Sequence, residues 1–299
     1  MRGITYLLLG GFFAGTLGVW IKLLGPDVSP FLLSVLRMFS VALLTLFLIF
    51  FMRKVRTLDL TKRELILFTV SGFFGVTLSV FFYVNAMVLA PVSNVVLILY
   101  FYPVFASILS WIFLKEKTKR IEIIAIIIAI TGIWIIYGFE FSGGCMLGNM
   151  LALLTGLFYA SFMVTTRYFE NRGEEYWKVV FWMFLIGGLI GLLWLPFEKT
   201  VFIASGPMPF FLAGVMVCTF LMYLFYSMGL KTVRAHNAPI ILLLTEPTTA
   251  IVLAWIVLSE VVTFHVLIGG ALLITASLLV EKEVRKKKIR RRKEAEAGR

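Results

Sequence analysis

The chain has 299 residues, of which 61% are hydrophobic and 15% are charged, and its formal net charge is +12. Soluble domains are typically about 45–50% apolar and about 25% charged, so this composition excludes a water-soluble enzyme. In a soluble protein such a positive charge would favour nucleic-acid binding. Here the basic residues lie between apolar runs, which is typical of membrane topology. We therefore expect an integral membrane protein that contacts membrane lipids and has no nucleic-acid partner.

The apolar runs predict ten membrane-spanning helices, since roughly 20 apolar residues cross a bilayer. In chain order the expected spans cover about residues 3–24, 30–52, 65–89, 93–114, 121–138, 147–167, 178–196, 209–230, 238–258 and 264–280. No small-residue cleavage site ends the first run, so we expect a retained helix rather than a signal peptide. The connections are too short for a soluble domain, and the predicted fold class is an all-α integral membrane protein.

The basic residues predict the orientation of these spans. If the N-terminus is cytoplasmic, 25 of the 28 lysines and arginines fall on the inner side, against Lys22 and Lys199 outside and Arg37 within a span. This asymmetry follows the positive-inside rule and predicts that both termini are cytoplasmic. The tail at residues 281–299 is interpreted as a topology anchor, or alternatively as a segment that recruits anionic lipid or a regulatory partner. A prokaryotic plasma membrane is the expected location.

The two halves of the chain are internally similar. The segment Leu99–Pro103 corresponds to Leu243–Pro247 at a shift of 144 residues, and the same shift places Trp111 on Trp255 and Glu116 on Glu260. Five spans in each half would insert the second half upside down. We therefore expect two inverted five-helix repeats, at residues 1–140 and 141–280. Inverted repeats are typical of secondary transporters with a substrate site near the membrane midplane.

The paired motifs resemble the EamA-like branch of the drug/metabolite transporter superfamily. That family typically has a mid-helix proline, a glutamate at the helix end and a glycine one helix later. The matching residues are Pro247, Glu260 and Gly269 in the second half, and Pro103 and Glu116 in the first, where Ala125 stands in the place of the usual glycine. An arginine early in the second helix, after a proline, is matched by Arg37 and Pro30. The resemblance covers about residues 4–280 and implies a ten-helix carrier.

The resemblance also has one departure, in the first span. Ala14-Gly15 stands where the family often has Trp-Gly. First-helix side chains often line the cavity in this family, so the departure bears on substrate identity. The substrate class that the resemblance implies is small polar metabolites, with export of amino acids or related compounds.

Glu246 is the most prominent candidate for a functional residue. It lies about 12 Å into its predicted span at 1.5 Å per residue, where an unpaired charge costs roughly 3 kcal/mol on insertion scales. One interpretation is a proton or cation site coupled to transport, with Pro247 loosening the helix beside it. The alternative is a structural carboxyl group that neighbouring hydroxyls such as those of Thr245 and Thr248 satisfy.

Three further charged residues in or beside the spans each have more than one interpretation. Arg37, about 10 Å into its span, either binds an anionic substrate group, or snorkels outward to cap carbonyls of the first span. A pair between Arg37 and Glu246 is a third possibility. Glu116 and Glu260 lie at helix ends, where the macrodipole does not favour negative charge. We expect each to cap a neighbouring helix or meet a loop cation.

Polar side chains within the other spans are candidates for the lining of a substrate cavity, because hydroxyl and amide groups in hydrocarbon need partners. Together with Glu246, Pro247, Thr245, Pro103 and Arg37, the candidate substrate and coupling residues are Tyr83, Tyr100, Tyr102, Tyr159, Tyr223, Tyr226, Asn85, Asn94 and Thr16. No metal site or cofactor is expected.

The leading functional hypothesis is therefore a secondary transporter. Translocation of lipids, lysolipids or amphipathic drugs by the same fold is the alternative. An intramembrane enzyme is a remote one, because no zinc-protease motif or comparable catalytic constellation is present. No ATP-binding motif is present either, so a gradient or exchange would supply the energy, with a proton or cation as a possible coupling partner.

Overall fold

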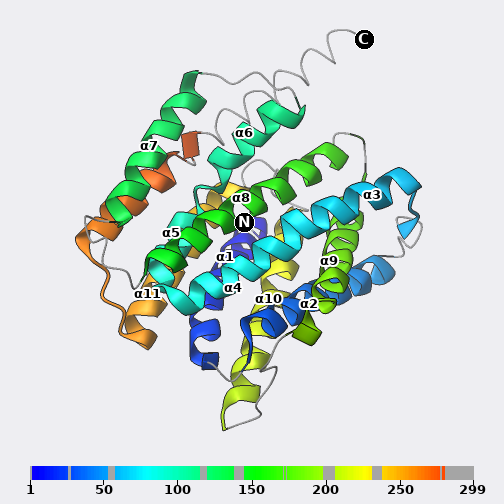
Figure 1. The fold of residues 1–299 in the computed structure, drawn as a ribbon, viewed down its shortest axis with the longest axis horizontal. Helices are drawn as coiled ribbons and strands as arrows, with labels where there is room; N and C mark the ends of the chain where they lie inside the picture. Colours follow the sequence, from blue (N-terminus) through cyan, green and yellow to red (C-terminus); the bar gives the residue numbers. More distant parts are fainter. Residues whose placement is uncertain are drawn as a thin grey trace.

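Every regular element in the described part of this computed structural model is a helix (Figure 1). The structure describes residues 2–25, 28–52, 58–114, 120–137, 145–170, 172, 174–197, 206–230, 238–276 and 278–279. The main helices are α1 (Arg2–Leu24), α2 (Pro30–Phe51), α3 (Lys62–Ser71), α4 (Ser79–Leu89), α5 (Val92–Leu99), α6 (Tyr102–Leu114), α7 (Arg120–Tyr137), α8 (Met146–Glu170), α9 (Tyr176–Leu192), α10 (Met208–Leu230) and α11 (Ala238–Leu258).

Among the described residues, six helical stretches are long and apolar enough to cross a membrane: Gly3–Leu24, Pro30–Phe51, Lys62–Leu89, Val92–Phe113, Met146–Thr166 and Met208–Tyr226. Four shorter apolar helices follow the remaining predicted spans, at Ile123–Gly132, Tyr176–Leu192, Thr245–Leu258 and Phe264–Ala276. The described helices confirm the expectation of an all-α protein with several apolar helices that can cross a membrane. The basic tail, Glu116 and most of the basic loops lie outside the described residues.

The helix starts carry ordinary capping chemistry. The Ser29 hydroxyl accepts a hydrogen bond from the Leu32 N–H (3.1 Å), and Pro30 occupies the first turn of α2, where its missing N–H costs nothing. Thr61 and Glu64 form a capping box at the start of α3. These local signals fix where the chain turns back into the bundle.

Two apparent spans are interrupted. The third contains a π-helical segment, η3 (Gly72–Leu78), between α3 and α4. The fourth opens between α5 and α6 at Tyr100 and Phe101, whose N–H groups bond only three residues back, to Leu97 (3.1 Å) and Ile98 (3.0 Å). Pro103 therefore lies in the first turn of α6, not in the middle of a continuous helix as the sequence predicted. Pro247, in contrast, is inside α11.

Helices of the two halves pack against one another in matched pairs. Helix α1 of the first half packs on α10 and α11 of the second half. Helix α8 of the second half packs on α4, α5 and α6 of the first half. The remaining large contact joins α2 to α9. At one edge of the bundle α7 lies beside Phe264–Ala276, where a Cβ on Gly132 would stand 2.8 Å from the Gly269 carbonyl oxygen (Figure 1). Each half thus contributes to every central interface.

Small residues allow this close packing. An added Cβ on Gly15 of α1 would lie 2.6 Å from the Glu246 carbonyl oxygen of α11, and one on Gly187 of α9 would lie 3.1 Å from the Gly72 carbonyl oxygen. Such contacts are typical of helix association in membranes. The outer surface is apolar instead: Trp111 and Trp255, which the internal similarity pairs, are 56% and 64% exposed.

Candidate functional site

The candidate site is centred on the hydrogen bond between Tyr100 and Glu246. The Tyr100 hydroxyl donates to Glu246 Oε2 across 2.8 Å, and the two residues are 146 positions apart in the chain. Tyr100 lies at the opening between α5 and α6, and Glu246 directly precedes Pro247 in α11. The structure therefore brings the two paired motifs into contact, and the carboxyl group is met by a hydroxyl of the other half.

Each half contributes a proline beside this bond. A proline has no N–H, and its ring collides with the carbonyl four residues earlier, so a proline weakens the helical hydrogen bonds just before itself. The opening at Tyr100 and Phe101 precedes Pro103, whereas Pro247 lies inside α11. Discontinuous helices supply substrate and ion sites in transporters. The Tyr100–Glu246 bond joins the opening before Pro103 to the residue before Pro247.

Four more of the candidate tyrosines extend from this bond. The Tyr102 ring lies 6.1 Å from Tyr100 and 5.0 Å from Tyr159, measured between ring centroids. Phe162 and Phe184 continue the series to Tyr223, whose ring lies 5.6 Å from that of Phe184. Tyr83 belongs to the same buried core as Tyr100. We call Tyr83, Tyr100, Tyr102, Tyr159 and Tyr223 the tyrosine cluster.

Arg37 reaches the tyrosine cluster from α2. The side chain is buried, and its guanidinium carbon lies 5.2 Å from the centre of the Tyr83 ring, a cation–π arrangement. The Arg37 side chain therefore points into the bundle and packs against the Tyr83 ring. The alternative that it snorkels outward does not match this geometry. Its ion pair with Glu246 is not formed in this structure.

Several other candidates lie apart from the centre or are occupied locally. The Thr16 hydroxyl donates to the Phe13 carbonyl oxygen (2.7 Å) and contacts Cys218, and the Asn85 amide donates to the Phe81 carbonyl oxygen (2.8 Å). Asn94 is half-buried in the first turn of α5. Tyr226 is at the edge of the tyrosine cluster, 6.3 Å from Tyr176 between ring centroids. Thr245 is half-buried beside Glu246.

Glu260, which follows α11, contacts the end of α1 and the start of α5 at one end of the bundle. Its carboxylate lies 3.0 Å from Lys22 Nζ at the end of α1, and accepts hydrogen bonds from the Val92 N–H (2.9 Å) and from Ser93 (3.4 Å). A carboxylate at a helix N-terminus is favoured by the macrodipole. The expectation that Glu260 caps a neighbouring helix and meets a cation is therefore confirmed on both counts.

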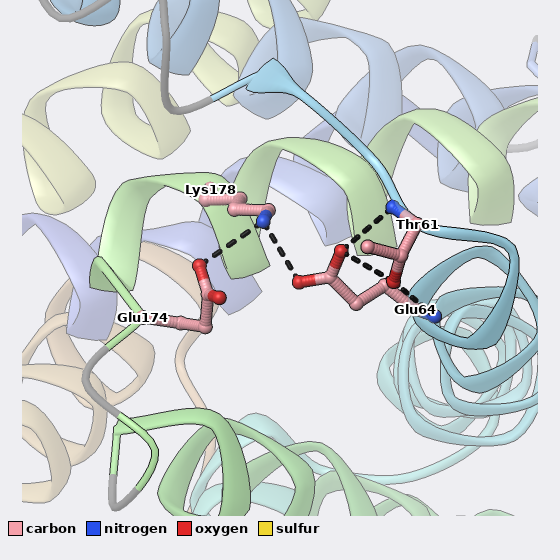
Figure 2. Close-up of polar contacts among 4 residues, drawn as sticks. All are labelled: Thr61, Glu64, Glu174 and Lys178. Atoms are coloured by element: carbon pink, nitrogen blue, oxygen red, sulfur yellow. Dashed lines mark hydrogen bonds and ion pairs between the residues drawn. The ribbon is translucent and has the colours of Figure 1, made fainter.

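At the opposite end a second charged group, the Lys178 cluster, joins α3 to α9. It consists of Thr61, Glu64, Glu174 and Lys178 (Figure 2). Lys178 Nζ lies 2.8 Å from Glu64 Oε1 and 3.0 Å from Glu174 Oε2, while the other Glu64 oxygen accepts from the Thr61 N–H and hydroxyl. This cluster was not predicted from the sequence, although the Thr61-x-x-Glu64 spacing is typical of a capping box.

The fold and its centre define a multi-pass membrane protein with polar groups enclosed between two sets of helices. A family model described as the EamA-like transporter family matches residues 1–138 and again 146–281, and the chain belongs to that family. The resemblance expected from the sequence is confirmed.

Two relatives extend this finding. An "Uncharacterized transporter" of Archaeoglobus fulgidus is 26% identical over 287 residues, covering 94% of this chain and 97% of its own length. Another of Clostridium kluyveri is 26% identical over 294 residues, covering 93% and 92%. A solved crystal structure covers 95% of this chain and 98% of its own, with a TM-score of 0.64 at 18% identity, which supports the fold alone.

Proposed function

We propose that this protein is a secondary transporter that moves small polar metabolites by alternating access, with export of amino acids or related compounds as its activity. The observation that carries the proposal is the Tyr100–Glu246 hydrogen bond between two proline-containing segments of opposite halves. A half-buried carboxyl group there is positioned to take up a proton or cation as the site changes sides. Membership of a transporter family agrees with this assignment.

The proposed architecture is ten spans in two inverted repeats, residues 1–140 and 141–280, followed by the tail at 281–299. Two facts support it. The family model matches once in each half. The large contacts of α1 with α10 and α11 also have counterparts in those of α8 with α4, α5 and α6. A two-fold relation between the repeats requires this, because it places α1 on α8, α10 on α4, and α11 on α5 and α6.

The proposed orientation has both termini on the cytoplasmic side of the plasma membrane. The charge asymmetry of the loops and tail supports it. In this orientation the Lys178 cluster lies at the cytoplasmic end of the bundle and Glu260 at the outer end. Rocking of one half against the other would then expose the tyrosine cluster to each side in turn.

Counterflow in proteoliposomes tests the proposal. Vesicles are loaded with one member of a panel of amino acids and other metabolites, and entry of the labelled compound is followed with and without a pH gradient. We expect saturable exchange of one compound class, and its loss with its pH-gradient dependence in Glu246→Gln. Asp59→Asn is the matched control, because Asp59 is an exposed carboxylate outside the helices.

Two outcomes would contradict the proposal. Unchanged exchange and an unchanged response to the pH gradient in Glu246→Gln would remove the coupling role of the carboxyl group. Absence of exchange for the whole panel in the wild-type protein would reject polar metabolites, and fluorescent lysolipids and amphipathic drugs would then be assayed in the same vesicles.

A further inference from the structure

Arg37 is a buried cation whose hydrogen-bonding capacity is not used up. Its side chain is only 8% exposed, and within the described part of the chain its Nε and Nη1 atoms have no hydrogen-bond partner. The described ion pairs involve Lys22 and Lys178, not Arg37. An arginine buried in this way pays a large desolvation penalty unless an anion or several acceptors receive it.

The neighbours of Arg37 hold the guanidinium in place without accepting from it. The Tyr83 ring lies 5.2 Å away and contributes a cation–π contact, which leaves the N–H groups of the guanidinium plane available. The nearest hydroxyls on α2 are directed to the backbone: Ser34 donates to the Pro30 carbonyl (2.7 Å) and Ser40 to that of Arg37 itself (2.8 Å). A planar fork of donors held in this way matches a carboxylate or a similar oxyanion.

Arg37 also belongs to the same centre as Glu246. Arg37 lies over Tyr83, and Tyr83 is buried in the same core as Tyr100, the hydrogen-bond partner of Glu246, so the cation on α2 and the carboxyl group on α11 reach the tyrosine cluster from different helices. A molecule that occupies this centre therefore meets one fixed positive group and one carboxyl group. This arrangement favours ligands that carry an anionic group, and among them dipolar ones.

We propose that Arg37 binds an anionic group of the transported molecule, so that the substrates are small organic anions or zwitterions bearing a carboxylate or comparable oxyanion. In a zwitterion the positive group would lie toward Glu246. This inference rests on the proposed function and names the substrate class of the same site.

Direct binding to the purified full-length protein in nanodiscs tests the inference independently of transport. The probes are one series: leucine, its amide, its decarboxylated amine and its deaminated acid. Each is measured by equilibrium binding and by the melting temperature, in a low-salt buffer that contains no other carboxylate, and chloride is titrated alone in a separate arm. We expect the two carboxylates to bind and the amide and amine to bind at least about 10-fold more weakly. Loss of one or two charge-assisted hydrogen bonds in Arg37→Gln should weaken carboxylate binding about 10- to 100-fold.

Arg172→Gln is the matched control. Arg172 is also an arginine over a tyrosine ring, 4.5 Å from the centre of Tyr168, but it is exposed; its removal should leave binding unchanged. Arg37→Lys, which keeps the charge without the planar fork, should bind carboxylates with intermediate affinity. If Arg37→Gln does not fold, the comparison of the four probes on the wild-type protein and the Arg37→Lys variant still decide the question.

Three results would overturn the inference. These are equal binding of the amide and the acid, unchanged carboxylate binding in folded Arg37→Gln, and Arg37-dependent stabilisation by chloride alone, which would make the occupant an inorganic anion. Each leaves the proposed function standing if counterflow of an uncharged or cationic compound is observed. Failure of the proposed function is seen separately, as carboxylate binding without any counterflow.

Discussion

At the scale of single residues, the hydrogen bond from Tyr100 to Glu246 decides how a carboxyl group is tolerated inside an apolar bundle. A carboxyl group without partners in such an interior is strongly unfavourable. Here the donor comes from a helix opening rather than from the same helix, so the bond also joins α5 to α11. Its strength therefore bears on both folding and transport.

Removal of this donor gives the first prediction. Tyr100→Phe keeps the ring contact with Tyr102 and deletes only the hydroxyl, so we expect a loss of about 1–3 kcal/mol in stability, the cost of a buried polar group left unpaired. Thermal unfolding in detergent, together with counterflow, measures it. Tyr6→Phe is the control, since Tyr6 stacks on Phe225 (6.2 Å) away from Glu246. Equal melting temperatures for the two variants would show that the bond carries no stability.

A second residue-scale prediction concerns Glu260. Glu260→Ala removes a cap of α5 as well as the partner of Lys22, whereas Lys22→Ala removes only the ion pair. Cap loss costs about 0.5–2 kcal/mol, and the ion pair, whose Lys22 side chain is partly exposed, contributes about 1 kcal/mol. We expect Glu260→Ala to lower the melting temperature more than Lys22→Ala. The reverse order would mean that the ion pair, not the cap, is the stabilising contact.

At the scale of helices, Gly15 sets how closely α1 approaches the Pro247 region of α11. The added Cβ of Gly15→Ala would stand 2.6 Å from the Glu246 carbonyl oxygen and 3.0 Å from the Ala250 nitrogen, so two backbones must separate. Gly10, also in α1, has its nearest such contact at 3.3 Å. The two positions therefore allow a matched comparison within one helix.

We expect Gly15→Ala to destabilise the protein by about 1–3 kcal/mol, the usual cost of overpacking, and to reduce counterflow because Glu246 is displaced. Gly10→Ala should have a clearly smaller effect in both assays. Indistinguishable melting temperatures and exchange rates would show that the contact between α1 and α11 adjusts without cost.

The helix boundaries were largely predictable from the sequence, and the reasons for the exceptions are local. Pro30 and Ser29 gave the start of α2, and the observed range Pro30–Phe51 differs from the prediction by one residue. Pro103 correctly indicated that the helix is interrupted. Because a proline restricts the residues before it, the interruption lies at Tyr100 and Phe101 and not at Pro103 itself. Whether a proline opens a span or stays inside one, as Pro247 does, depends on its neighbours in space.

The composition of the central site was predictable, but its connections were not. Apolar spans make every ionisable or hydroxyl side chain conspicuous, which is why Glu246, Arg37 and the tyrosines stood out. The hydrogen-bond donor to Glu246 is a residue 146 positions away in the chain. Periodicity along one helix carries no information about such a contact. The sequence suggested Thr245 and Thr248 as partners, whereas the described hydrogen bond comes from Tyr100.

At the scale of the whole molecule, charged contacts lie at both ends of an otherwise apolar bundle. The Lys178 cluster joins a helix of the first half to one of the second, across 114 positions between Glu64 and Lys178. The Lys178 side chain is 7% exposed and that of Glu64 is 13% exposed. Removal of one partner from a buried pair costs far more than removal of both, because it leaves a charge uncompensated.

We therefore expect Lys178→Met to cost about 3–5 kcal/mol and to lower the melting temperature more than the double variant Glu64→Gln/Lys178→Met. Arg172→Gln, at an exposed position nearby, serves as a control for loss of a positive charge. Additive losses in the double variant would show that Glu64 and Lys178 do not depend on one another.

The π-helical segment has a consequence for the tyrosine cluster. A π turn holds more residues than an α turn, so the helix beyond it is rotated relative to an uninterrupted continuation of α3. Tyr83, five residues after Gly72–Leu78, therefore owes its direction to the number of residues in that segment. Deletion of a single residue there would turn Tyr83 by about 100°, away from Arg37. The position of Tyr83 in the tyrosine cluster is thus fixed by the number of residues in η3 as well as by the chemistry of its side chain.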